Sequence, residues 1–264
     1  MKRYDDSKYI NKDTLLDFCN TNEEHLVAPV RGIVVEFPGL GGGSCLGGLM
    51  ENESYSTEWA KRFAKKGIVL AYLFPGPWSW GNKGAVRMAD AVVTALADKY
   101  GLKPGFPVAA CGGSMGGVGA LIYAAESNFT LCAVASACPC VDVVKNISEV
   151  PVFAKSYISA AAVYDMELKD ALMRFSPISR IPDMQKSIYF VCSDGKDSVF
   201  PEHECDEYVA KLRELGHDVE YHRQPGLEHG EFFPEIREKL HMCIENAIIK
   251  CALIRKRTHF GKMK

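Results

Sequence analysis

Residues 107–127 read PVAACGGSMGGVGALIYAAES, and three kinds of local structure follow one another within this stretch. The first five residues are small and apolar, as in a short buried strand. The next six, Gly112 to Gly117, include four glycines and suit a sharp turn. From Val118 to Ser127 small and apolar residues continue in a helical pattern. The stretch therefore predicts a strand that turns tightly and runs directly into a helix.

Within this turn, Gly112-x-Ser114-x-Gly116 matches the nucleophile-elbow motif G-x-S-x-G. A serine on a sharp strand-to-helix turn has strained backbone angles and closely packed neighbours, so small residues are needed on both sides of it. The turn lifts the hydroxyl off the sheet, and the new helix directs its free N–H groups toward developing negative charge. We therefore predict that Ser114 is a catalytic nucleophile.

A serine is a weak nucleophile without a base, so the motif predicts an acid and then a histidine further along, each just after a strand. Asp194 and Asp197 follow a predicted strand at 187–192. His229 follows a predicted strand at 219–222 and lies in a loop between two glycines. Both expectations are met in the expected order, and on this argument alone either aspartate could be the acid.

Outward from the elbow, short apolar runs alternate with longer helical patterns over most of the chain. This alternation predicts a parallel sheet with crossover helices, and we expect a single α/β domain over residues 1–264. The predicted strands lie at 31–37, 68–74, 107–111, 131–137, 187–192 and 219–222, and the predicted helices at 55–66, 85–100, 118–127, 201–215 and 233–254.

A long stretch without a strand signal, residues 141–186, separates two of these strands. Its pattern is helical around 152–163 and 168–175. The length exceeds what a simple crossover requires, so we expect a small helical cap over a pocket. The alternative is one crossover helix with a long irregular connection.

With these residues in this order, the chain resembles the α/β-hydrolase superfamily from about residue 31 to residue 254. In that superfamily the acid commonly lies in a loop spelled G-x-x-D-x-x-V-P. Residues 197–201, DSVFP, resemble the second half of this spelling and favour Asp197 as the acid. Asp194 occupies the place of the usual glycine, and this departure keeps it as the alternative.

The resemblance also implies the roles of the base and the acid. His229 would take the proton of Ser114 and later pass it to the leaving group. Asp197 would fix the tautomer of that histidine and stabilise its charged form.

An oxyanion hole needs two converging donors, and one should be the backbone N–H of Met115, directly after the nucleophile. The other should come from the glycine-rich loop after the first predicted strand, where we favour the N–H of Leu40, with Gly41 as the neighbour that could replace it. Related enzymes often begin this loop with histidine, where this chain has Pro38. The loop fits neither G-x-G-x-x-G nor a Walker lysine, so we do not expect nucleotide binding.

Two tryptophans, Trp78 and Trp80, lie in a Pro/Gly loop after the strand at 68–74, on the sheet edge expected to carry Ser114. Their rings could stack on an aromatic or sugar substrate. They could equally hold the loop against the body of the protein.

Composition narrows the range of partners. The net charge of −2 provides no general attraction to nucleic acid or to an anionic membrane. The chain has no apolar run long enough to span a bilayer and no signal peptide after Met1, and several of its ten cysteines lie in buried-strand patterns, so we expect a cytoplasmic protein with free thiols. Cys138 and Cys140 lack a second ligand pair for zinc, and we expect neither a metal nor an organic cofactor.

These features predict a serine hydrolase that cleaves a carboxylic ester, with an acylated carbohydrate or a small acyl ester as its substrate. Residues 113–117, GSMGG, resemble esterases of the feruloyl- and acetyl-esterase kind. They are also similar to the catalytic domain of prolyl-oligopeptidase-type peptidases, so a peptidase or amidase is the alternative. A third possibility is a non-catalytic binding protein with the same fold, but the presence of all three catalytic-type residues argues against it. Acyltransferases and lyases could also use these three residues. The sequence gives no indication of an oligomeric state.

Overall fold

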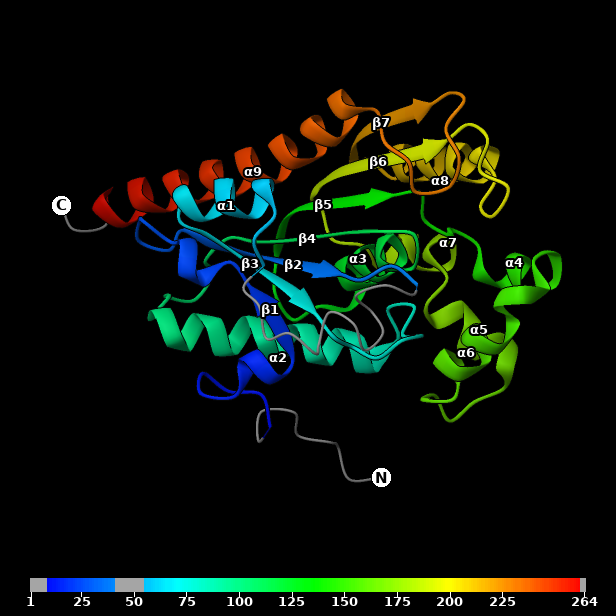
Figure 1. Cartoon of the computed structure of the whole chain (residues 1–264), viewed down its shortest axis with the longest axis horizontal. Coiled ribbons are helices and arrows are strands. Elements are labelled where there is room, and N and C mark those ends of the chain that lie inside the picture. Colours follow the sequence, from blue (N-terminus) through cyan, green and yellow to red (C-terminus); the bar gives the residue numbers. More distant parts are fainter. Residues whose placement is uncertain (1–8, 41–54, 262–264) are drawn as a thin grey trace.

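The computed structural model describes residues 9–40 and 55–261, and a seven-stranded sheet forms the centre of this part of the chain (Figure 1). The strand order is β1-β3-β2-β4-β5-β6-β7. Neighbouring strands from β3 to β7 are parallel, and β1 alone pairs antiparallel, with β3. The strands are β1 (Cys19–Thr21), β2 (Gly32–Phe37), β3 (Ile68–Leu73), β4 (Val108–Gly113), β5 (Leu131–Ala137), β6 (Ile188–Asp194) and β7 (Asp218–Gln224).

All six strands expected from the sequence are present, and the mostly parallel sheet is confirmed. The seventh, β1, was not expected. It has only three residues, which is too short to show a two-residue alternation of apolar side chains.

Helices cover both faces of the sheet. α1 (Glu58–Lys65) and α9 (Pro234–Gly261) pack on one face, and α2 (Lys83–Tyr100), α3 (Met115–Glu126) and α8 (Glu202–Glu214) pack on the other. Successive residues of a strand point to opposite faces. In β2, Val34 belongs to the core beneath α1 and α9, whereas Val35 belongs to the core beneath α2 and α3. Burial on both faces explains why the central strands are apolar throughout.

Between β5 and β6 the chain forms only helices. They are α4 (Val143–Glu149), a 3₁₀ turn (Pro151–Phe153), α5 (Ala154–Ala161), α6 (Leu168–Arg174), α7 (Pro177–Arg180) and a second 3₁₀ turn (Ile181–Asp183). The two helices expected around 152–163 and 168–175 correspond to α5 and α6, whereas α4 and α7 were not separately expected. Figure 1 shows α4 to α7 gathered at the end of the sheet toward which the parallel strands point.

These helices are held to the body by hydrogen bonds from the loop that leads into α2. The indole Nε1 of Trp80 donates to Ser156 Oγ at 3.0 Å, and Asn82 Nδ2 donates to the carbonyl of Ala160 at 3.2 Å. The backbone N–H of Lys83 donates to the Tyr164 hydroxyl at 2.9 Å.

None of the helices within residues 9–40 and 55–261 combines the length and the apolar character needed to cross a bilayer.

Candidate active site

Ser114 lies between β4 and α3 with φ 56° and ψ −124°, a backbone conformation that non-glycine residues rarely adopt. The elbow expected from the sequence is therefore present. Its two motif glycines are required by close approach of the backbone. A Cβ at Gly116 would lie 2.0 Å from the carbonyl oxygen of Phe37, and one at Gly112 would lie 2.4 Å from the carbonyl oxygen of Gly116.

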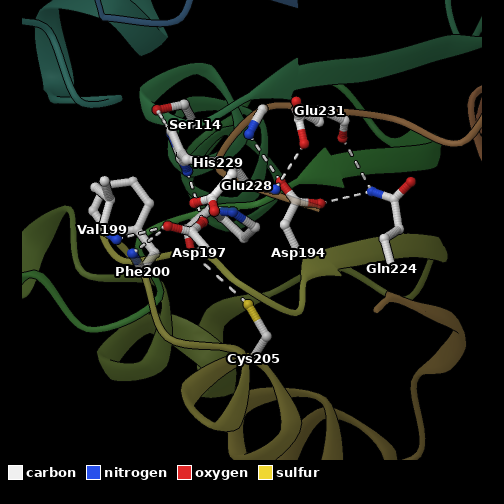
Figure 2. A network of polar contacts seen from close by, with 12 residues as sticks. Ser114, Asp194, Asp197, Val199, Phe200, Cys205, Gln224, Glu228, His229 and Glu231 are labelled. Atoms are coloured by element: carbon white, nitrogen blue, oxygen red, sulfur yellow. Dashed lines mark hydrogen bonds and ion pairs between the residues drawn. The ribbon is translucent and has the colours of Figure 1, made fainter. Parts of the chain in front are cut away.

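A continuous line of hydrogen bonds joins Ser114, His229 and Asp197 (Figure 2). His229 Nε2 lies 2.9 Å from Ser114 Oγ, and His229 Nδ1 lies 2.6 Å from Asp197 Oδ2. With the imidazole proton on Nδ1, Nε2 can accept the hydrogen bond of the serine hydroxyl. The structure thus brings together the three residues expected to act as nucleophile, base and acid.

The second carboxylate oxygen of Asp197 is fixed by the backbone. Asp197 Oδ1 accepts hydrogen bonds from the N–H groups of Val199 at 2.7 Å and Phe200 at 2.8 Å. The Asp197 side chain has no exposed surface, whereas that of His229 is 25% exposed. The carboxylate therefore keeps one orientation, in which Oδ2 faces the histidine.

Asp194, the alternative acid, has a different set of partners. Its Oδ1 accepts from Gln224 Nε2 at 2.7 Å, and its Oδ2 accepts from the N–H of Gly230 at 2.8 Å (Figure 2). Burial raises the pKa of this carboxyl above its usual range, opposed by these two hydrogen bonds. Asp194 thus holds the backbone of Gly230, the residue directly after His229. A glycine, which is usual at position 194 in the superfamily, has no side chain to make this contact.

Of the three residues expected to form an oxyanion hole, two lie in the described part of the chain. Met115 is buried and is the first residue of α3, where a backbone N–H has no acceptor within the helix. Leu40 follows Gly39, which lies against the elbow: a Cβ on Gly39 would be 4.0 Å from the Ser114 Cβ. Gly41 lies outside the described residues.

The two tryptophans are in different environments. Trp80 is fully buried with φ 46°, and its hydrogen bond to Ser156 holds the loop in place, so of the two readings the structural one applies to it. Trp78 is 46% exposed.

Beside Trp80 lies an aromatic cluster that sequence reasoning did not identify. The Trp80 ring packs on Tyr157, Phe153 and Phe200, with centroid distances of 4.5, 6.1 and 6.3 Å. The Phe200 ring in turn meets the His229 ring edge-on at 5.1 Å. The cluster connects α5 to the histidine. Phe200 lies in the motif DSVFP, but nothing in that spelling indicates a contact with the base.

One group of side chains in the described part of the chain has the donors for a metal ion. Donor atoms of Cys138, Asp194 and His229 lie within 4.8 Å of one another. The nitrogens of His229 already contact Asp197 and Ser114, and both oxygens of Asp194 accept hydrogen bonds. A metal ion here would have to displace those contacts.

The strand order, the elbow and the order of the three residues along the chain define the α/β-hydrolase fold. Residues 79–242 match the family model described as the prolyl oligopeptidase family, and this range contains Ser114, Asp197 and His229. The chain therefore belongs to the prolyl oligopeptidase family, a family of serine hydrolases.

Solved structures with the same fold include peptidases and esterases. A puromycin hydrolase superposes with a TM-score of 0.67 at 18% identity, covering 85% of this chain and 34% of that one. Esterase B from Lactobacillus rhamnosis gives 0.60 at 14% identity, covering 89% of this chain and 81% of that one. An acylaminoacyl peptidase from Pyrococcus horikoshii gives 0.61 at 13% identity, covering 82% of this chain and 36% of that one.

The chain thus spans about a third of the length of the two peptidase-type structures and about four-fifths of the length of the esterase. No protein of curated function matches its sequence.

Proposed function

We propose that this protein hydrolyses a carboxylic ester of a small acyl substrate by way of an acyl-enzyme. The observation that carries the proposal is the hydrogen-bonded line from Ser114 Oγ through His229 to Asp197 Oδ2, at 2.9 and 2.6 Å. Each contact has the length and order that nucleophile activation requires.

In the proposed mechanism, His229 Nε2 takes the proton of Ser114 as Oγ attacks the ester carbonyl carbon. The N–H groups of Met115 and Leu40 would stabilise the oxyanion, with Gly41 as the alternative donor. His229 then protonates the alcohol as it leaves, and the acyl group stays on Ser114. The same nitrogen removes a proton from water, which attacks the acyl-enzyme and releases the acid.

The ester substrate is supported by the likeness to esterase B, which this chain matches over most of both lengths. The second candidate is a peptidase or amidase, supported by the prolyl oligopeptidase family and by the likeness to a puromycin hydrolase. An esterase and a peptidase would use the same three residues. The two candidates differ in the leaving group, which is an alcohol for an ester and an amine for a peptide or amide.

We further propose that residues 1–264 form one domain in which α4 to α7, within 141–186, act as a small cap. The support is the aromatic cluster that links Tyr157 of α5, through Trp80 and Phe200, to His229. Exposed Trp78 is proposed to contact substrate. We propose no nucleic-acid or membrane partner, and the cytoplasmic location stays a prediction.

Labelling with a fluorophosphonate probe, followed by mass spectrometry to locate the adduct, tests the activated serine. We expect the adduct on Ser114 and its loss in Ser114→Ala and His229→Ala. Ser198→Ala is the matched control, because Ser198 is exposed and adjoins Asp197, and it should label as the unmodified protein does. A folded protein that takes no label would favour the non-catalytic binding protein.

Substrate class is then decided by comparing kcat/KM for p-nitrophenyl acyl esters with that for aminoacyl p-nitroanilides. Higher kcat/KM for the esters supports the proposal. Higher kcat/KM for the anilides, with Ser114 still labelled, would replace the esterase by the peptidase.

A further inference from the structure

Two of the described cysteines, Cys132 and Cys251, form a pair far from Ser114. Most other described cysteines are buried, whereas both members of this pair are partly exposed. Cys132 is the second residue of β5, and Cys251 lies in the second half of α9. They are therefore at the amino-terminal end of the parallel strands, while Ser114 follows the carboxyl end of β4.

A break in strand register directs Cys132 toward the helix. Val108 of β4 pairs with Leu131, but the next residue, Ala109, pairs with Ala133. Cys132 is thus the additional residue of a β-bulge, which changes the direction of a side chain relative to a regular strand. α9 packs across β5, and the two thiols form a side-chain hydrogen bond. Thiols in hydrogen-bonding contact are neighbours, which is the first requirement for a disulfide between them.

The pair is open to small molecules. Both cysteines line a hollow of about 670 Å³ between the end of α9, the start of β5 and the loop before β4. The walls are mostly apolar and include Phe106, Phe129 and Ile254.

The environment makes the two thiols chemically unequal. The hydrogen bond from Cys132 lowers the pKa of Cys251 to about 6, with a smaller contribution from Lys250, against the effect of burial. The same hydrogen bond and burial raise the pKa of Cys132. Cys243, eight residues earlier in α9 and also partly exposed, has its pKa raised to about 12 by burial. Because the pKa of Cys251 is lowered and that of Cys132 is raised, we assign Cys251 as the attacking thiol and Cys132 as the resolving thiol.

We propose that Cys132 and Cys251 form a redox-active dithiol site that reacts with low-molecular-weight disulfides of the glutathione type. The Cys251 thiolate attacks one sulfur of the small disulfide, forms a mixed disulfide and releases the first small thiol. Cys132 then loses its proton and attacks the Cys251 sulfur, which closes the protein disulfide and releases the second small thiol. Two protein thiols are oxidised by two electrons, and one small disulfide is reduced to two thiols.

The product would link β5 covalently to α9. Because the bond closes a long loop of chain, it should stabilise the folded state chiefly by restricting the unfolded state. The site is separate from the proposed active site, so failure of one proposal does not affect the other.

The test uses the full chain in buffers of graded oxidised-to-reduced glutathione ratio, with acid quenching, N-ethylmaleimide alkylation and peptide mapping by mass spectrometry. The unmodified protein should yield a Cys132–Cys251 linked peptide that dithiothreitol removes, and its melting temperature should rise. Cys132→Ser should accumulate a glutathione adduct on Cys251, because no resolving thiol remains. Cys251→Ser should give neither product, and Cys243→Ser should behave as the unmodified protein.

A second measurement uses only the unmodified protein, so it tests the proposal even if one of the variants fails to fold. In the unmodified protein at pH 7, Cys251 should react with iodoacetamide at least about tenfold faster than Cys243, because the pKa of Cys251 is lowered whereas that of Cys243 is raised by burial. Equal rates at the two cysteines, or absence of the linked peptide at the most oxidising ratio, would overturn the proposal.

Discussion

Asp194 and Asp197 are three positions apart, yet they hold different parts of the candidate site. Asp197 has one oxygen on His229 and the other on two backbone N–H groups. Asp194 binds Gln224 and Gly230, and therefore acts on the loop that carries the histidine rather than on its ring. Removing the charge of Asp197 should therefore affect the orientation of the imidazole, and removing that of Asp194 should affect the position of the loop that carries it.

Asp197→Asn should lower kcat/KM for a p-nitrophenyl ester by about three to four orders of magnitude, because the amide favours the wrong histidine tautomer. Asp194→Asn should lower it far less, by about tenfold, because the amide oxygen still accepts from Gln224 and only the Gly230 N–H loses its acceptor. Fluorophosphonate labelling rates should follow the same order. A larger loss in Asp194→Asn than in Asp197→Asn would transfer the acid role to Asp194.

The elbow glycines provide a second test at single residues. Gly116→Ala would place a Cβ 2.0 Å from the Phe37 carbonyl oxygen, and neither backbone can yield without opening the contact between β2 and α3. We expect a loss of about 1–3 kcal/mol or more in the free energy of unfolding, measured by urea denaturation. Gly113→Ala is the matched control, since its Cβ would have no neighbour closer than 3.9 Å and should change stability by less than about 1 kcal/mol. Equal losses of stability in the two variants would show that the close approach of Gly116 to Phe37 is not the reason why glycine is needed at position 116.

Much of the site could be predicted from sequence because backbone strain restricts which residues can form it. A Cβ does not fit at Gly112 or at Gly116, the positions two residues before and after Ser114, so the motif is visible in the chain. The preference for Asp197 rests on the spelling DSVFP. In the structure Asp197 Oδ2 faces His229, whereas both carboxylate oxygens of Asp194 accept hydrogen bonds from other residues. The roles of Phe200 and Gln224 could not be predicted. Phe200 packs against the ring of His229, and Gln224 forms hydrogen bonds with Asp194 and with the backbone of Phe233. Neither kind of contact requires a fixed spacing of residues in the sequence.

Among the elements, long apolar strands were predictable and short or polar ones were not. β4 and β5 are buried on both faces and read as apolar runs, whereas β1 has three residues with partial burial at its centre. The cap was predictable only as an insertion of excess length. Its arrangement depends on tertiary hydrogen bonds such as that of Trp80 with Ser156, which pairs residues far apart in the chain.

Asn82 joins two elements, and its two functions can be separated. Its Oδ1 caps α2 by accepting from the N–H groups of Gly84 and Ala85 at 3.0 and 3.1 Å, while its Nδ2 donates to Ala160 in α5. Asn82→Asp keeps the acceptor at the helix N-terminus but sets a carboxylate against a carbonyl oxygen. Asn82→Ala loses both contacts.

If the contact with Ala160 holds the cap, both variants should increase amide hydrogen exchange in α5. Only Asn82→Ala should also increase exchange in the first turn of α2, with an added cost of about 1 kcal/mol for the lost cap. Unchanged exchange in α5 for both variants would mean that the remaining contacts hold the cap, namely the aromatic cluster and the hydrogen bonds of Trp80 with Ser156 and of Lys83 with Tyr164.

At the scale of the whole molecule, one partly buried carboxyl should give folding stability a characteristic pH dependence. Glu36 lies on β2 in register with Tyr72 and Cys111, on the face covered by α1 and α9. Its Oε2 is buried without a hydrogen-bond partner, and Tyr55 donates a hydrogen bond to the side chain. Burial raises the pKa of this carboxyl from 4.5 to about 8, against the smaller opposing effect of Tyr55.

Between pH 4.5 and about 8 the folded protein therefore holds one more proton at Glu36 than the unfolded chain does. Raising the pH through this window favours the unfolded state, so the contribution of Glu36 to the free energy of unfolding should fall by at most about 1.4 kcal/mol per pH unit and become constant above it. Glu36→Gln keeps the shape and removes the titration, so its stability relative to the unmodified protein should rise steadily from pH 5 to pH 8. Urea denaturation at several pH values measures this difference, with exposed Glu214→Gln as the control that should show no such trend. A difference between Glu36→Gln and the unmodified protein that stays constant with pH would mean that Glu36 is ionised in the folded state, and that the sheet face under α1 and α9 accommodates a charge.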